Sequence, residues 1–214
     1  VSQRTKALVA SNKNLNIISE IGKEIASTKE LGSVLEKIYE QVTQLMDVYI
    51  FSIGIYHKKE NTIDFALSIK EEKRYAKYTR DMLQKEQLSV WCINNNQPIL
   101  ISDADDQVSK YVDVEGWKVA LKDHPLGDVN EAKSHLYVPL SLKSEPVGII
   151  AVHSMNRNAY DDKKLDILKM LATYAAIAVD NANKIHEVEQ ANKSLLQAQE
   201  DLKTSYERLE EISE

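Results

Sequence analysis

The sequence predicts an α+β fold, in which a central antiparallel sheet lies between helical segments at the two ends of the chain. Three observations lead to this prediction. Apolar residues near the N-terminus recur at helical spacing, whereas in the middle of the chain they alternate with polar residues as in strands. After Gly148 the chain contains neither glycine nor proline, so nothing interrupts a long C-terminal helix.

The composition limits the classes of protein to which the chain could belong. The chain has 214 residues and a formal net charge of −6, which argues against a nucleic-acid-binding protein. Hydrophobic residues make up 43% of it, enough for one sizeable core. The single cysteine, Cys92, allows no internal disulfide. No apolar run approaches the roughly 20 residues that span a bilayer, so we expect a cytoplasmic segment without membrane contact, although its parent protein could be anchored in a membrane.

Two helices are expected at the N-terminal end. Residues 4–26 carry apolar residues at heptad spacing and are predicted to form the first helix. Ser27 and Glu30 fit a capping box, which predicts that a second helix begins there and continues to residue 46. Its apolar positions follow the stripe of a helix with one buried face: Leu31, Val34, Leu35, Ile38, Val42, Leu45 and Met46.

Further along, the apolar period changes to two. Residues 51–55 and 63–69 alternate on either side of a polar loop and are predicted to form a hairpin. The charged residues 70–88 predict a loop or a short helix, residues 89–95 one or two helical turns, and residues 98–101 a short strand.

The second half of the chain begins with a long polar segment. Residues 103–133 are weakly periodic, as in a functional lid or a mobile insertion. Two further strands are predicted over 135–142 and 147–154. Asp161 and Asp162 then supply the negative charge that stabilises a helix N-terminus, so the exit helix is expected to begin there.

The C-terminal end of that helix has the pattern of a coiled coil. From Val188 the apolar residues keep heptad spacing through Leu195, Leu202 and Leu209. Residues 187–214 also hold eight acidic and three basic residues, whereas residues 1–14 hold three basic and no acidic ones. The two ends therefore differ in composition from the centre.

Several segments, taken in order, resemble the GAF domain family. SHLYVPL at residues 134–140 and VGIIAVHS at 147–154 resemble the family's S-x-x-x-VPL and GxxxV motifs, and LATYAAIAVDNA at 171–182 resembles its closing helix. NLNIISEIGKEIAS at 14–27 and LSVWCINNNQPILISD at 88–103 are similar to its opening and middle.

The resemblance implies three parts: an N-terminal signalling helix (1–14), a GAF sensor domain (15–186) and a C-terminal coiled-coil linker (187–214). It implies an antiparallel sheet with the N- and C-terminal helices on one face and a small-molecule pocket on the other. GAF domains are input modules, some of which bind cyclic nucleotides, bilins, haem or metabolites, and they commonly dimerise through their terminal helices. We therefore expect a homodimer through the terminal helices and an unknown small-molecule ligand; the sequence requires no cofactor.

Six residues are candidates for contacting that ligand: Trp91, Cys92, Asp103, Tyr111, Trp117 and Tyr137. The four aromatic residues lie within or beside the segment where the family's ligand covers sit. A GAF cysteine can carry a bilin, but Cys92 lacks the adjacent histidine of the bilin-binding subfamilies, which favours a core role. Asp103 belongs to an acidic cluster that resembles half a calcium loop, but the glycine and distal glutamate of an EF-hand are absent.

Other ligand sites have weaker support. His135 and His153 would be cross-strand neighbours if their hairpin loop centres on Ser144, but no second Cys/His pair at metal-binding spacing accompanies them, so no metal site is expected. His124 is expected to be solvated in a loop. NRNAYDD at 156–162 matches only part of the pattern associated with cyclic-nucleotide binding, and the start of a helix explains it equally.

No catalytic motif is present, so the chain is not expected to be an enzyme. We expect a regulatory domain that signals through a dimeric helical bundle to an effector outside these residues. The lead-in helix resembles those of bacterial sensor histidine kinases of two-component systems. There are three alternatives. The chain could be the input domain of a diguanylate cyclase, because LEEISE at 209–214 resembles the lead-in to such a cyclase domain. It could instead precede a second GAF domain, or it could be a dimerisation spacer that binds no ligand. A GAF-folded free-methionine-sulfoxide reductase would need several cysteines.

Overall fold

The structure, a computed structural model, describes residues 30–127, 129 and 131–213. The helix expected over residues 4–26, the signalling helix of residues 1–14 and the predicted cap Ser27 lie outside the described residues. The chain divides into two units, of which the structure describes residues 30–179 and 180–213 apart from the gaps at 128 and 130.

The described residues confirm an α+β fold built on one antiparallel sheet of seven strands. The strands are β1 (Ile50–His57), β2 (Thr62–Lys70), β3 (Lys73–Arg74), β4 (Tyr78–Asp81), β5 (Ile99–Ile101), β6 (Ser134–Leu142) and β7 (Glu145–Ser154). Their order is β3-β2-β1-β7-β6-β5, and β4 also pairs with β2. Both predicted hairpins, β1–β2 and β6–β7, are present.

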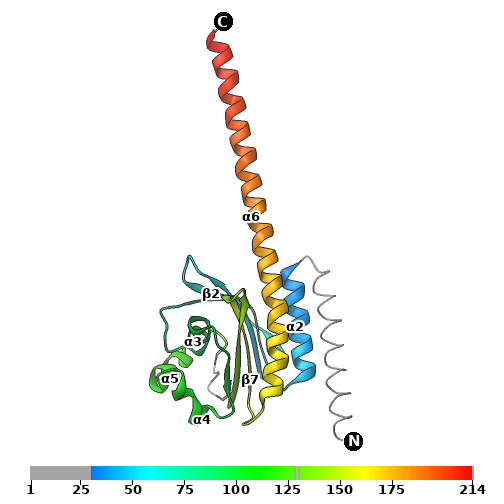
Figure 1. Cartoon of the computed structure of the whole chain (residues 1–214). Coiled ribbons are helices and arrows are strands. Elements are labelled where there is room, and N and C mark those ends of the chain that lie inside the picture. The colour runs from blue at the N-terminus through cyan, green and yellow to red at the C-terminus, as the bar shows by residue number, and fades with distance from the viewer. Residues whose placement is uncertain (1–29, 128, 130, 214) are drawn as a thin grey trace, which may run out of the picture. The chain divides into compact units, whose positions relative to one another are not determined.

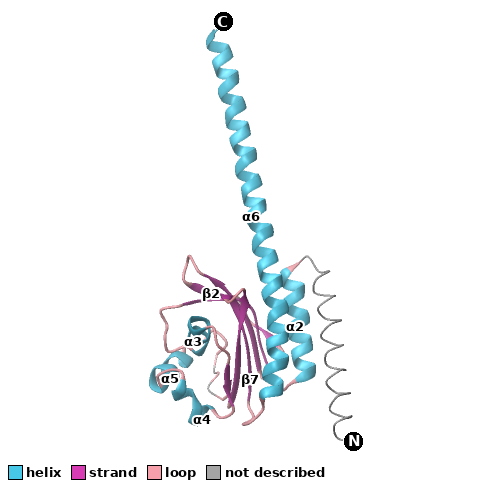
Figure 2. Cartoon of the chain, in the orientation of Figure 1, coloured by secondary structure: helices cyan, strands magenta, loops and turns pink. Residues whose placement is uncertain are grey.

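Helices cover both faces of the sheet. They are α2 (Leu31–Leu45), α3 (Leu88–Asn95), α4 (Ala104–Gln107), the 3-10 helix η1 (Val108–Lys110), α5 (Val114–Lys122) and α6 (Asp162–Ser213). Figure 1 shows α2 and the first turns of α6 on one face, and α3, α4 and α5 on the other. Figure 2 shows the strands as one layer between these two sets of helices.

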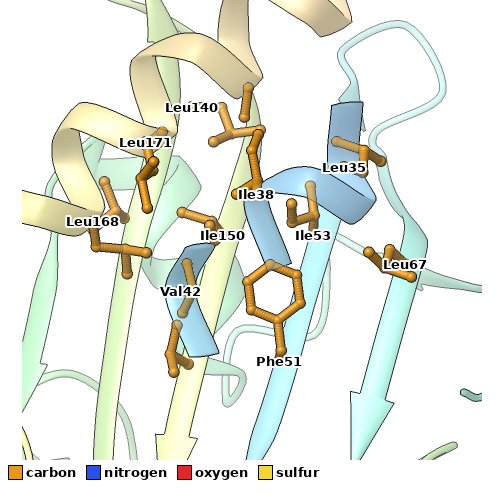
Figure 3. Close-up of a cluster of buried hydrophobic side chains, with 14 of the residues drawn as sticks. Leu35, Ile38, Val42, Phe51, Ile53, Leu67, Leu140, Ile150, Leu168 and Leu171 are labelled. Atoms are coloured by element: carbon orange, nitrogen blue, oxygen red, sulfur yellow. The ribbon is translucent and has the colours of Figure 1, made fainter. Parts of the chain in front are cut away.

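The face toward α2 and α6 is a continuous apolar core, which we call the helix-face core. Its sheet side includes Phe51, Ile53 and Ile150, all fully buried. α2 contributes the predicted stripe Val34, Leu35, Ile38 and Val42, and α6 contributes Leu168, Leu171, Ala175 and Val179. Figure 3 shows these side chains meeting between helix and sheet. Burial of this apolar surface is the main force that holds the two helices on the sheet.

Three predictions about the elements were incomplete. The segment 70–88 forms two short strands, β3 and β4, because the free edge of β2 supplies backbone partners that a polar sequence does not reveal. The segment 103–133 contains α4, η1 and α5, the last capped by Asp113, whose Oδ2 accepts from the Gly116 amide at 2.7 Å. The second helix begins at Leu31, with Glu30 as its N-cap and no side-chain cap bond.

The β6–β7 register depends on a bulge. The turn consists of Lys143 and Ser144, both with positive φ, so it is centred half a residue before Ser144. A register shift between Leu140 and Ser141 corrects this half residue, and His135 therefore pairs directly with His153. The glycine of the GxxxV motif has a steric role, since a Cβ at Gly148 would collide with the Gly54 carbonyl oxygen on β1.

The exit helix starts where the sequence predicted. Asp161 Oδ1 accepts from the Lys164 amide at 2.9 Å and caps the N-terminus of α6. In the second unit the apolar side chains at heptad spacing are exposed, with Val188 at 60%, Leu195 at 58% and Leu202 at 58% of their surface. Nowhere in the described residues does a helix combine the length and the apolarity needed to cross a bilayer.

Candidate functional site

A cavity lies between the sheet and the segment that contains α5. Its volume is about 40 Å3, space for about three water molecules. The described residues that line it are Ile50, Ser52, Phe65, Tyr78, Arg80, Gln87, Ser89, Trp117, Leu121, His124, Leu126, Val129, His135, Tyr137, Ala151 and His153. They include one guanidinium and three imidazoles but no carboxylate, so the described lining carries a positive charge and no negative one.

Strand pairing explains why these residues meet. Side chains alternate between the two faces of a strand, so on β6 His135 and Tyr137 face the cavity while Leu136 enters the helix-face core. On β7 the cross-strand partners Ala151 and His153 fall on the same face, opposite Tyr137 and His135. The outer strands β2 and β4 add Phe65, Tyr78 and Arg80, and the start of α3 adds Ser89.

Arg80 is the charged group of the cavity. Its side chain is only 8% exposed, and its guanidinium donates to Ser89 Oγ at 2.8 Å and lies 3.1 Å from His124 Nε2. The guanidinium carbon also lies 5.2 Å from the ring centre of Phe65 and 5.8 Å from that of Tyr78. Within the described residues no carboxylate pairs with it. A buried cation with only neutral partners is costly in free energy.

His124 was expected to be solvated, but it is partly buried and lines the cavity. The Leu126 amide lies 3.2 Å from its Nδ1 and the Arg80 guanidinium 3.1 Å from its Nε2, but a neutral imidazole accepts a hydrogen bond at only one nitrogen, so one of these two donors faces an N–H of the ring. Burial, then the charges of Arg80 and Lys70, lower the pKa of His124 to about 3. The imidazole is therefore neutral at physiological pH, and one of its two contacts brings two donors together.

His135 and His153 form a second imidazole pair. Their Nδ1 atoms are 2.6 Å apart, so one ring donates and the other accepts. Burial, assisted by Lys133, lowers the pKa of His135 to about 4, and burial together with His135 lowers that of His153 as well. The Nε2 atom of His135 is buried and makes no hydrogen bond within the described part of the chain. This edge of the cavity thus carries an unsatisfied polar atom.

Two of the six candidate residues, Trp117 and Tyr137, line the cavity. The Trp117 ring contacts that of His135 at a centroid distance of 5.8 Å, and Tyr137 contacts His153 at 5.2 Å. Burial raises the pKa of Tyr137, so its hydroxyl stays protonated and can donate a hydrogen bond. These two side chains join the α5 segment and β6 to the same site.

The other four candidates lie outside the cavity lining. Trp91 and Tyr111 pack edge to face, with ring centres 4.9 Å apart. The Cys92 side chain is fully buried in the apolar cluster around α3, where burial raises its pKa. Asp103 caps α4 and pairs with Arg157 at 2.6 Å. In this structure their contacts are structural ones.

The GAF domain family model matches residues 30–181, most of the chain. The chain belongs to the GAF domain family. These are sensory and regulatory domains, found in kinases and in other proteins. None of the curated proteins matches the sequence.

Solved structures share the fold at low identity. The GAF domain of an Acinetobacter phosphoenolpyruvate-protein phosphotransferase has a TM-score of 0.60 at 15% identity, over 81% of this chain and 96% of that one. The GAF domain of a Bacillus halodurans two-component sensor histidine kinase has a TM-score of 0.57 at 14% identity, over 74% and 99%. A Neisseria meningitidis free methionine-R-sulfoxide reductase has a TM-score of 0.59 at 10% identity, over 80% and 91%. At these identities the likeness concerns the fold alone.

Sequence reasoning missed the most polar part of the GAF domain's cavity. Arg80, Gln87 and Ser89 lie in or next to the segment read as a loop or short helix. A weak signal was present, since Tyr78, Arg80 and Met82 alternate with polar residues as in a strand with one buried face. Arginine at such a position reads as solvent-facing unless the buried partner surface is known.

No group of three or more His, Cys, Asp and Glu side chains suited to a metal ion occurs in the described ranges. The guanidinium, imidazoles and hydroxyls among the described lining residues are suited to recognition by hydrogen bonds and charge.

Proposed function

We propose that this GAF domain binds a small molecule in the cavity and transmits the binding event through α2 and α6 to an effector domain, in the first instance a histidine kinase. The observation that supports this most strongly is the position of the cavity. Buried polar groups gather on the sheet face opposite α2 and α6, where they stabilise the fold less than apolar residues would. A ligand that forms hydrogen bonds with these polar groups would explain why they are buried there.

A hydrogen-bonded junction connects the cavity strands to the helices. Ser134, which precedes the cavity residue His135, bonds to the Asn156 carbonyl at 2.7 Å and accepts from the Ala159 amide at 3.2 Å. Ser154, which follows His153, donates to the Asp47 carboxylate. Each cavity histidine thus neighbours a serine that holds the β7–α6 loop.

Asp47 completes this junction on the helical side. Its carbonyl accepts from the Tyr160 hydroxyl at 2.8 Å, and its carboxylate accepts from the Asn156 side chain at 3.0 Å. Asp47 follows the end of α2 and Tyr160 precedes α6, so a shift of β6 and β7 on ligand binding would reach both helices. This is the route we propose for the signal.

We further propose that the domain acts as a homodimer. The exposed heptad residues Val188, Leu195 and Leu202 form an apolar stripe on a helix, and a second copy of that helix would cover it by coiled-coil packing. A parallel dimer would give both copies the same direction of signalling. The protein is proposed to work in the cytoplasm.

Two other functions remain as alternatives. A diguanylate cyclase in place of the kinase would use the same cavity and helices. A pure dimerisation spacer would have α6 but no ligand. Enzymatic reduction, suggested only by the fold of the methionine sulfoxide reductase, is disfavoured because the raised pKa and full burial of Cys92 leave it without a reactive thiolate.

The proposal is tested by blocking the cavity. Ala151→Val adds two methyl groups to the cavity wall, whereas Ala66→Val makes the same change on β2, where Ala66 packs against the helix-face core. A metabolite panel is screened by thermal shift with wild type and both variants. We expect at least one compound to raise the melting temperature of wild type and Ala66→Val but not of Ala151→Val. If no compound stabilises wild type, or if Ala151→Val responds equally, the cavity is not a ligand site and the spacer is the better account.

The effector is tested in the parent protein. The compound found in the screen is expected to change the rate of histidine autophosphorylation in wild type and to leave Ala151→Val unchanged. Production of a cyclic dinucleotide instead would favour the cyclase alternative.

A further inference from the structure

The chemistry of Arg80 narrows the kind of ligand that the cavity takes. A guanidinium carries five N–H donors and a permanent charge. Arg80 is 8% exposed, and its polar contacts within the described residues are the Ser89 hydroxyl and the His124 ring. Neither partner is charged, so the positive charge of Arg80 is not neutralised by any described residue.

The contact with His124 adds to this deficit. The Leu126 amide points at Nδ1 and the Arg80 guanidinium at Nε2, and a neutral imidazole can accept from only one of these two donors. An acceptor oxygen in the cavity beside the guanidinium would receive the hydrogen bonds that His124 and Ser89 leave unmatched. Among the described residues, no anionic acceptor lies at this place.

The remaining walls define the rest of the ligand. Phe65, Leu121, Leu126 and Val129 line the cavity with apolar surface. The volume of about 40 Å3 has space for only a few non-hydrogen atoms. A short alkyl group fits such walls, and a sugar or a nucleotide does not.

We propose that the cavity binds a short-chain monocarboxylate, whose carboxylate is held by Arg80 and whose alkyl group faces Phe65 and the leucines. This inference rests on the proposed small-molecule function and specifies its ligand class. Arginine suits this role because its planar fork matches the two oxygens of a carboxylate. Ser89 and Tyr137 also line the cavity and add two hydroxyl donors to it.

The experiment measures binding of propionate to the full chain by isothermal titration calorimetry, with sodium chloride used to keep ionic strength constant. Propionamide has nearly the same shape without the charge, and nitrate has the planar oxygens without the alkyl group. We expect saturable one-to-one binding of propionate, at least about tenfold weaker binding of propionamide, and weaker binding of nitrate.

Variants locate the site. Arg80→Gln is expected to weaken propionate binding at least about tenfold, because it removes a charge-assisted hydrogen bond. Arg74→Gln is the matched control: Arg74 lies on β3, pairs with Glu36 at the surface and should leave the affinity within about twofold. If Arg80→Gln fails to fold, Ser89→Ala keeps the charge, removes one cavity donor and is expected to weaken binding about threefold to tenfold.

Each contrary result has a separate meaning. Equal binding of propionamide, or full affinity in Arg80→Gln, overturns the assignment of an anion while leaving a small-molecule site in place. Nitrate binding without propionate binding overturns the assignment of a carboxylate as the bound anion. No binding of propionate, when another compound shows cavity-dependent binding in the screen, overturns this inference alone; no binding by any compound overturns the proposed function with it.

Discussion

The two faces of one sheet are built in opposite ways. On β6, Leu136 and Val138 enter the helix-face core, whereas His135 and Tyr137 face the cavity. The helix-face core gathers apolar side chains together with the rings of Tyr39 and Tyr160. On the other face, several buried polar side chains line the cavity: Ser52, Arg80, Gln87, Ser89 and His135. The helix face maximises stability, and the cavity face keeps polar groups whose burial costs stability.

This difference divides residues 30–179 into a face that supports folding and a face that we propose binds a ligand. Burying a polar group costs free energy, about 1–3 kcal/mol where the group is left unsatisfied, so a face that gathers buried polar groups is expected to have a use for them. Substitutions on the helix face should therefore act on folding, and substitutions on the cavity face should act first on binding. Four predictions test that contrast, in order of decreasing effect on stability.

The largest effect is expected in the helix-face core. Phe51 is fully buried and its ring lies 5.2 Å from that of Tyr39. Phe51→Ala leaves a cavity between helix and sheet and should lower the free energy of unfolding by about 3–5 kcal/mol in urea titrations. Leu83→Ala, at a side chain that is 72% exposed, is the control and should stay within about 0.5 kcal/mol. A small loss for Phe51→Ala would contradict the tight packing described for this face.

The cavity face should make stability depend on pH. The pKa of His124 is lowered to about 3 and that of His135 to about 4, whereas the unfolded chain protonates its histidines near 6.5. As pH falls below 6.5, the unfolded chain takes up protons that the folded chain does not, so stability falls by about 1.4 kcal/mol per pH unit for each such histidine.

Urea unfolding at several pH values between 7 and 4.5 measures this slope. His135→Gln should make the slope shallower. A slope that is unaffected by His135→Gln would mean that this imidazole is not held neutral by burial.

A smaller effect is expected at the junction between the faces. Tyr160→Phe removes the hydrogen bond to the Asp47 carbonyl and should cost about 1 kcal/mol. Tyr174→Phe on α6, where no described residue bonds to the hydroxyl, is the control. If the junction carries the signal, Tyr160→Phe should also reduce the effect of ligand on the effector by more than its cost in stability explains. If Tyr160→Phe and Tyr174→Phe change the effect of ligand on the effector equally, the junction does not carry the signal.

The smallest effect on the stability of the folded unit is expected in the exposed stripe. Leu195→Ser combined with Leu202→Ser changes side chains that are 58% exposed, so unfolding of residues 30–179 should shift by no more than about 0.5 kcal/mol. Sedimentation should nevertheless change from dimer to monomer if the stripe is the dimer seam. An unchanged sedimentation coefficient would argue against the coiled-coil dimer.

Elements in which one pattern repeats over several positions could be predicted from the sequence. The stripe of α2, the two hairpins and the capped start of α6 each repeat one pattern over several positions, and local patterns of that kind survive folding. The sheet edge was not predictable, since β3 and β4 are strands only because β2 offers unpaired backbone.

The site was predictable in part for the same reason. Trp117 and Tyr137 are aromatic and belong to segments that the family resemblance pointed to. Arg80 and His124 are charged or polar residues in polar segments, and their burial depends on contacts between parts of the chain 44 residues apart. The pairing of His135 with His153 depends on a bulge in the β6–β7 pairing, between the Leu140–Gly148 and Ser141–Pro146 pairs, that no local pattern marks.

Hydrogen–deuterium exchange with and without a saturating cavity ligand, either propionate or the compound found in the screen, tests the central claim, that the cavity face binds and the junction transmits. The account predicts slower exchange in β4, α5 and the residues from 134 to 137, together with a change at residues 155–161, where the β7–α6 loop meets Asp47. Protection that is confined to α2 or α6, or no change in any cavity segment, would contradict it.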